Sequence, residues 1–91
     1  MDEKMEKLMV QIKKVIKLLK QRLENDPDRQ ILKTLYDRYT KAEEILLYNK
    51  DIGKIMIKGG CRAYLDAFSD YMNPLLIEMD RAEELLLELI K

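Results

Sequence analysis

The sequence predicts an all-α fold, an antiparallel helical bundle of three long helices with the last kinked or split near Asn73-Pro74. Two observations carry this prediction. Leu, Ile, Met, Glu and Lys dominate the 91 residues while Val and Thr are nearly absent, a mixture that favours helices over strands. Apolar residues also recur at alternating steps of three and four, the coiled-coil-like spacing of a buried helix face. A chain of this length is expected to form one domain, residues 1–91.

The first helix is expected over residues 2–24, where one apolar seam contains Met5, Met9, Ile12, Ile16, Leu19 and Leu23. The second is expected over residues 27–58. Asp26 suits its N-cap, and Pro27 suits the first helical position because proline has no N–H to leave unpaired there. The second apolar seam contains Leu32, Leu35, Tyr39, Ala42 and Leu46, then drifts to Ile45, Tyr48, Ile52 and Ile55. That drift extends the expected helix past Asn49 and Gly53 to Lys58.

Gly59-Gly60 is the strongest break in the chain and is predicted to end the second helix in a left-handed turn. An unbroken heptad spacing follows, through Leu65, Phe68, Met72, Leu75, Met79, Ala82, Leu86 and Leu89. Pro74 interrupts it by removing a backbone donor, and Asn73 suits the N-cap of a new helix. Two interpretations stay open: one kinked helix, or two helices over residues 61–72 and 74–91, giving a three- or four-helix bundle.

The charge distribution is uneven although the net charge is zero. Residues 1–62 carry 15 basic and 10 acidic side chains, or +5, whereas residues 63–91 carry 2 basic and 7 acidic side chains, or −5. Zero net charge argues against a dedicated nucleic-acid or membrane-surface protein. We therefore expect the two halves to face one another or a second copy. The lysines of the first helix, Lys13, Lys17 and Lys20, are expected to face the acids Asp80, Glu84 and Glu88.

The residue types exclude several chemistries. The chain has no His, one Cys and three Gly, so it contains no Ser-His-Asp triad, no Cys- or His-based zinc site and no P-loop. The remaining candidates for a Mg²⁺ site are carboxylates, namely Glu43, Glu44, Glu83, Glu84, Glu88, Asp66 and Asp70. We interpret these as a solvated helix face, and Cys61 as a small buried residue. The sequence therefore predicts no enzyme activity, no cofactor and no metal.

No stretch approaches the roughly 20 apolar residues that span a bilayer. The first residues, Met1 to Lys7, mix acids with bases and do not resemble a secretory signal. We therefore expect a cytoplasmic protein without a membrane partner.

A difference in helix length predicts a protein–protein interaction module. The first helix would be ~35 Å long and the second ~46 Å, at about 1.5 Å per residue. The overhanging tip would expose apolar residues that the first helix cannot cover, which monomers rarely leave in water. These candidate self-association residues are Ile52, Ile55, Met56, Ile57, Tyr64, Leu65 and Phe68. The expected partner is a second copy, giving a homodimer, or another protein.

The alternative function is a small regulator that binds an anionic ligand or nucleic acid at the basic Gly59-Gly60 turn. Free N–H groups at a helix start favour an anion there. The candidate residues are Lys54, Lys58, Gly59, Gly60 and Arg62. An ordinary helix–helix turn explains the same glycines, because the pattern lacks the fixed spacing of a phosphate-binding loop.

Overall fold

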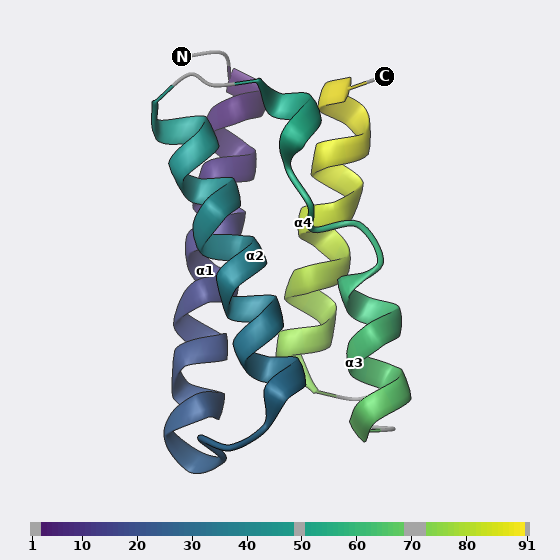
Figure 1. Ribbon diagram of the computed structural model, residues 1–91. Helices are drawn as coiled ribbons and strands as arrows, with labels where there is room; N and C mark the ends of the chain where they lie inside the picture. The colour runs from purple at the N-terminus through teal and green to yellow at the C-terminus, as the bar shows by residue number, and fades with distance from the viewer. Residues whose placement is uncertain (1–2, 49–50, 69–72, 91) are drawn as a thin grey trace.

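The computed structural model describes residues 3–48, 51–68 and 73–90, and within them the fold is all-α, with no strand. It contains four α-helices and a 3-10 helix: α1 (Glu3–Asn25), α2 (Gln30–Leu47), η1 (Ile52–Lys54), α3 (Gly60–Phe68) and α4 (Pro74–Ile90). The long helix α1 packs along both α2 and α4, and neighbouring helices run antiparallel (Figure 1). The predicted all-α bundle is confirmed, with the last predicted helix split into α3 and α4.

The turn between α1 and α2 differs from the prediction. Helix α2 begins at Gln30, and the residue at its N-cap is Arg29, whose side chain makes no capping hydrogen bond. The carboxylate of Asp26 instead lies 3.0 Å from Arg29 Nε, and the Asp26 carbonyl accepts a hydrogen bond from Arg29 N. Asp26 therefore shapes the turn, and the prediction that it caps a helix beginning at Pro27 is wrong.

Helix α2 ends at Leu47, so the prediction of a continuous helix to Lys58 is wrong. The Asp51 side chain accepts a 2.9 Å hydrogen bond from Gly53 N and starts the short η1 turn. An extended segment, residues 55–57, follows η1. Side chains alternate sides in an extended chain, so Ile55 and Ile57 are buried while Met56 is exposed. The apolar drift that suggested a longer helix belongs to this segment.

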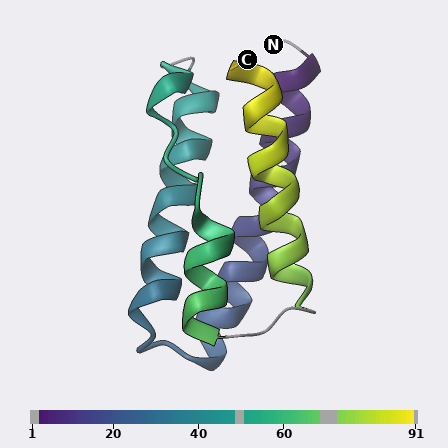
Figure 2. The ribbon, with the colours of Figure 1, turned by 90° about the vertical axis from the view of Figure 1, so that its right-hand side faces the viewer.

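The extended segment and α3 together form a fourth column of the bundle. They run back between α2 and α4, with the extended segment level with the C-terminal half of α4 and α3 beside its N-terminal half (Figures 1 and 2). Gly59 has φ +86°, so the predicted left-handed turn is confirmed, although it leads into α3 and does not end α2. Gly60 is buried against α2, where an added Cβ would lie 3.2 Å from Leu35 Cδ2. Both glycines are therefore needed to bring α3 onto the bundle.

Asn73 caps α4 as the sequence predicts. Its side-chain oxygen accepts a 2.8 Å hydrogen bond from Leu75 N, and its amide nitrogen lies 3.0 Å from the Tyr64 hydroxyl. This second contact ties the start of α4 to the buried face of α3.

One continuous core runs through the described helices and the extended segment. It contains Leu8, Met9, Ile12, Val15, Leu19, Leu32, Leu35, Tyr39, Ala42, Leu46, Ile55, Ile57, Tyr64, Leu75, Met79, Ala82 and Leu86. The Cα trace is 35 Å in its longest dimension, which equals the length of a 23-residue helix at about 1.5 Å per residue. The predicted overhang beyond α1 is therefore wrong, because the chain folds back over the tip.

Candidate functional site

The start of α3 is held by a carboxylate from α4. Glu83 Oε1 accepts a 2.8 Å hydrogen bond from Gly59 N, and Oε2 accepts a 3.2 Å hydrogen bond from Cys61 N. These are the N–H groups that the sequence suggested for an external anion, and a helix N-terminus stabilises negative charge. Because Glu83 occupies them, a free anion would first have to displace it.

The basic residues proposed for that anion point to water. Lys54, Lys58 and Arg62 are all exposed. Gly59 is exposed and Gly60 is buried against α2. The five candidate residues thus surround a turn whose N–H groups are already paired, which removes the main physical argument for the anion site.

Two ionisable side chains lie around Glu83 inside the bundle. Burial, the Glu83 charge and the neighbouring Cys61 raise the pKa of Tyr39 far above its usual value. Burial, a hydrogen bond to Glu83, and the Glu83 and Asp80 charges raise the pKa of Cys61 in the same direction. Both groups therefore stay protonated at neutral pH, and Cys61 lacks the thiolate that a nucleophile needs.

A groove opens beside this turn, between the extended segment and the C-terminal half of α4. We call it the Met56 groove. It has a volume of about 540 Å³ and is lined by Arg38, Gly53, Ile55, Met56, Lys58, Glu83, Leu86, Leu87 and Ile90. Three of its apolar side chains are well exposed: Met56 at 67%, Leu87 at 47% and Ile90 at 49%. The groove is thus an apolar strip that the chain leaves open to water.

The two edges of the Met56 groove carry opposite charges. Arg38 of α2 and Lys58 of the turn form the basic edge, and neither has an ion-pair partner among the described residues. Glu84 and Glu88 lie on the far side of Leu87, about 60–100° further round α4 at ~100° per residue. Both are exposed, and neither forms an ion pair with a basic side chain among the described residues. Glu83 also lines the groove, but its carboxylate is engaged by the N–H groups of Gly59 and Cys61. The exposed charges are therefore basic on one side of the apolar strip and acidic on the other.

Most of the predicted self-association residues lie inside the chain's own fold. Ile55, Ile57 and Tyr64 are core residues, and Ile52 and Leu65 are half-buried. Met56 is the one of the seven that is largely exposed. The sequence interpretation assigned the others to a surface because it continued α2 to Lys58.

Phe68 is also covered. Its ring centroid lies 4.7 Å from that of Tyr64, and the guanidinium carbons of Arg22 and Arg29 lie 5.2 and 4.8 Å from it. Cations placed over an aromatic ring are attracted to its electron-rich face. Phe68 therefore fastens the end of α3 to the α1–α2 turn and is not a free contact residue.

Leu87 and Ile90 are groove residues that the sequence reasoning missed. The heptad seam of α4 assigns Leu86 and Leu89 to the buried face and assigns no role to the neighbouring Leu87 and Ile90. A signal was present, because Leu85-Leu86-Leu87 and Leu89-Ile90 are wider than one helix face requires. Apolar residues in excess of the seam predict a second apolar surface.

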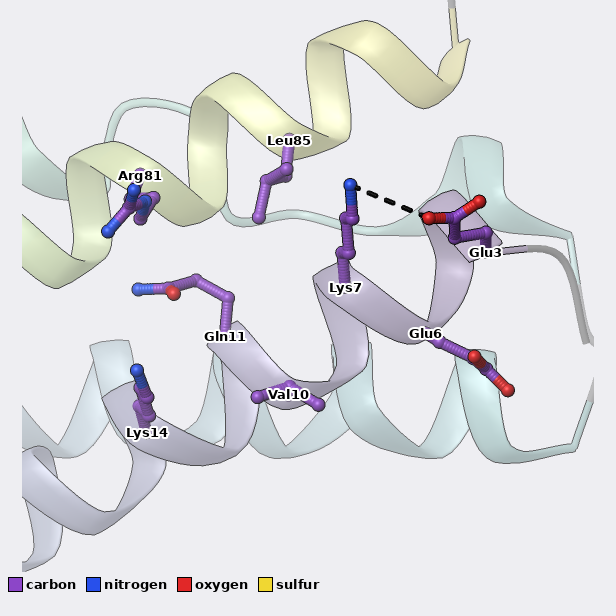
Figure 3. Close-up of a pocket in the computed structure, with 8 residues that line it drawn as sticks. All are labelled: Glu3, Glu6, Lys7, Val10, Gln11, Lys14, Arg81 and Leu85. Carbon is purple, nitrogen blue, oxygen red and sulfur yellow. Dashed lines mark ion pairs between the residues drawn. The ribbon is translucent and has the colours of Figure 1, made fainter.

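A second hollow lies between α1 and the middle of α4, and most of the residues that line it are charged or polar (Figure 3). Lys7 Nζ is 3.8 Å from Glu3 Oε1 at one end of it. Gln11 is 5% exposed and donates from Nε2 to the Glu78 carbonyl at 2.9 Å and also to the Glu78 carboxylate. The Gln11 amide thus joins α1 to α4. The hollow has less apolar surface than the Met56 groove.

The predicted facing of lysines and acids across α1 and α4 is wrong. Asp80, Glu84 and Glu88 are exposed, and in the described ranges none of them pairs with a lysine of α1. Lys14 and Lys17 instead share a shallow hollow with Glu78. Among the acids of α4, it is therefore Glu78 that lies beside lysines of α1.

The carboxylates do not gather into a metal site within the described residues, where no three His, Cys, Asp or Glu side chains come close enough to hold an ion. Asp66 is exposed, and Asp70 lies outside the described residues. No helix in the ranges described is both long and apolar enough to cross a membrane.

Comparison with known proteins gives one family. Residues 2–91 match the family described as "YeeD uncharacterised protein". A curated relative, "Uncharacterized protein YeeD" of Bacillus subtilis (strain 168), is 35% identical over 89 residues, which cover 89% of this chain and 87% of the relative. No solved structure matches the chain. The family match spans all four helices.

Proposed function

This chain belongs to the YeeD family, and we propose that it is a non-enzymatic helical module that binds another protein chain through the Met56 groove. The observation that carries the proposal is that three exposed apolar side chains, Met56, Leu87 and Ile90, line one groove. The other large apolar side chains exposed among the described residues, Val10, Leu47, Tyr48 and Ile77, do not line it. Single exposed apolar residues are common on monomers, but a continuous apolar groove with a charged rim is typical of a binding surface.

The chemistry of the groove supports binding rather than catalysis. The one carboxylate that lines it, Glu83, accepts hydrogen bonds from Gly59 N and Cys61 N, and the other two ionisable side chains of the lining, Arg38 and Lys58, are basic. Met56 is an unbranched, flexible side chain that adapts its shape to an apolar partner. The charged rim gives direction to the contact, because a partner must match its order of charges.

Photo-crosslinking in the source cell tests the proposal. Met56 and Leu87 are replaced, one at a time, by the photoreactive p-benzoylphenylalanine. We expect either position to attach the chain to a protein on irradiation. The matched control is Val10, which is exposed in the charged hollow between α1 and α4 and is expected to give no adduct. If both groove positions give no protein adduct, the proposal fails.

A further inference from the structure

We propose that the occupant of the Met56 groove is a second copy of this chain, related by a two-fold axis that runs along the groove, parallel to α4. The inference rests on the proposed function, because it names the partner of the same surface. It also specifies how the two copies are oriented.

The order of charges across the groove supports a second copy. The lining is basic at Arg38 and Lys58, and the exposed acids Glu84 and Glu88 flank it beyond Leu87, with the apolar strip between the two charges. A partner carrying one sign of charge would satisfy one edge and meet like charge at the other. The same strip turned over offers both signs at the required spacing, so this surface is complementary to itself.

The direction of the two-fold axis follows from the same pattern. A two-fold interface uses one surface patch on both copies. Rotation about an axis along the groove places the basic edge of one copy opposite the acidic edge of the other. Rotation about an axis across the groove would place basic edge against basic edge. The first arrangement sets the two α4 helices parallel and buries Met56, Leu87 and Ile90 of both copies in the centre.

The whole-chain charge agrees with this pairing. The +5 of residues 1–62 and the −5 of residues 63–91 meet only partly inside one chain, since Glu84 and Glu88 are exposed and form no ion pair with a base among the described residues. Pairing along the groove brings α4 of one copy beside α2 and the turn of the other. The basic part of one copy then lies beside the acidic part of the other.

Sedimentation equilibrium of two charge-reversed variants tests the inference. One variant reverses the basic edge (Arg38→Glu with Lys58→Glu), and the other reverses the acidic edge (Glu84→Lys with Glu88→Lys). We expect the parent chain to dimerise and each variant alone to show a dimer dissociation constant raised by ~10-fold or more, because like charges then face each other. Mixed in equal amounts, the two variants are expected to pair with one another. Circular dichroism checks that both remain folded.

The orientation is tested by spin labels placed at Ile77 in the parent chain. The two labels lie at the same height if the α4 helices are parallel. If the α4 helices were antiparallel and crossed at Leu87, the two labels would lie at opposite ends. The distance between them along the helix axis would then be about 30 Å, at ~1.5 Å per residue. A measured separation that includes this distance would overturn the proposed axis.

Several outcomes would reject the second copy. A parent chain that sediments at 10.9 kDa up to millimolar concentration would do so, as would variants that dimerise like the parent. Crosslinking from Leu87 to a different protein, with no adduct of twice the chain mass, would reject the second copy and leave the binding module standing. Absence of any protein adduct rejects the module itself, so the two failures are distinguishable.

Discussion

Glu83 of α4 accepts a 2.8 Å hydrogen bond from the backbone N–H of Gly59, 24 residues earlier in the chain. Together with the second hydrogen bond, from Cys61 N, it attaches the first turn of α3 to the middle of α4. Burial raises the pKa values of Tyr39 and Cys61, and the Glu83 charge raises both further. One side chain therefore fixes the fourth column of the bundle and adds to the pKa shifts of two neighbouring groups.

Replacing this carboxylate by an amide is expected to destabilise the fold. Glu83→Gln removes the negative charge that two N–H groups point at, and hydrogen bonds to a charged group stabilise more than neutral ones. We expect the free energy of unfolding to fall by about 1–2 kcal/mol, measured by urea unfolding. Glu24→Gln is the matched control, because Glu24 is exposed and lies outside the Met56 groove, and it should leave the midpoint unchanged. Equal losses in the two variants would contradict the role of Glu83.

Cys61 is expected to react slowly with alkylating reagents. Burial first, and then the hydrogen bond to Glu83 and the charges of Glu83 and Asp80, raise its pKa, so little thiolate exists at pH 8. Iodoacetamide should modify the folded chain at least ~10-fold more slowly than the chain in concentrated urea. Glu83→Gln should speed the reaction of the folded chain, since it removes an anion beside the thiol. A folded-state rate equal to that in urea would refute the expectation.

Tyr39→Phe is expected to leave the fold intact or stabilise it by up to about 1 kcal/mol. The Tyr39 hydroxyl is buried and has no hydrogen-bond partner within the part of the chain described, so the variant removes a polar group that folding takes out of water. Urea unfolding at pH 8 measures the difference. A loss of several kcal/mol would mean that the hydroxyl makes a stabilising interaction.

The same substitution should change how stability depends on pH. The pKa of Tyr39 is raised in the folded chain above its usual value of 10.0. Its contribution to stability is therefore complete below pH 10 and is lost as the pH rises further, because only the unfolded chain releases the proton. Between pH 9 and 11, the parent should lose stability more steeply than Tyr39→Phe. Cys61 acts in the same direction in both proteins, so it cancels in the comparison.

Removal of the Asn73 side chain should cost more stability than removal of the Asp26 side chain. Asn73→Ala removes the acceptor for Leu75 N and the contact with the Tyr64 hydroxyl, and is expected to lower the unfolding free energy by about 1–2 kcal/mol. Asn73→Asp keeps an acceptor for Leu75 N and should lose less. Asp26→Ala breaks one exposed ion pair and should lose under about 0.5 kcal/mol. Thermal or urea unfolding measures the free energy of unfolding of the three variants. A larger loss for Asp26→Ala than for Asn73→Ala would contradict this prediction and indicate that Asp26 caps α2.

Much of the fold could be predicted from local pattern. The seam from Met5 to Leu23 places α1 correctly, and Asn73 with Pro74 marks the start of α4. Gly59 was identified as a left-handed turn because few other residues adopt positive φ. These features depend on residues within a few positions of one another, which is the range over which helix periodicity, capping and turn chemistry act.

The candidate site could be predicted only in part. The sequence predicts Met56 as part of an overhang and Lys58 as a neighbour of the glycines, but it does not predict the groove that joins them to Leu87 and Ile90. It gives no reason to include Arg38, because Arg38 lies on α2, far from these residues in sequence. The walls of a groove come from elements that are distant in the chain, and a local sequence pattern does not predict how far apart those elements lie in space.

The sequence by itself determined the helical class, the faces that pack and the uneven charge, because each follows from the identity and spacing of residues. The tertiary structure decided that α2 ends at Leu47, that Ile55 and Ile57 enter the core from an extended segment, and that Glu83 holds the start of α3. The physical reason is that an apolar run such as residues 55–57 satisfies either a helix or an extended chain locally. The free space between α2 and α4, which only the packed bundle creates, selects between the two.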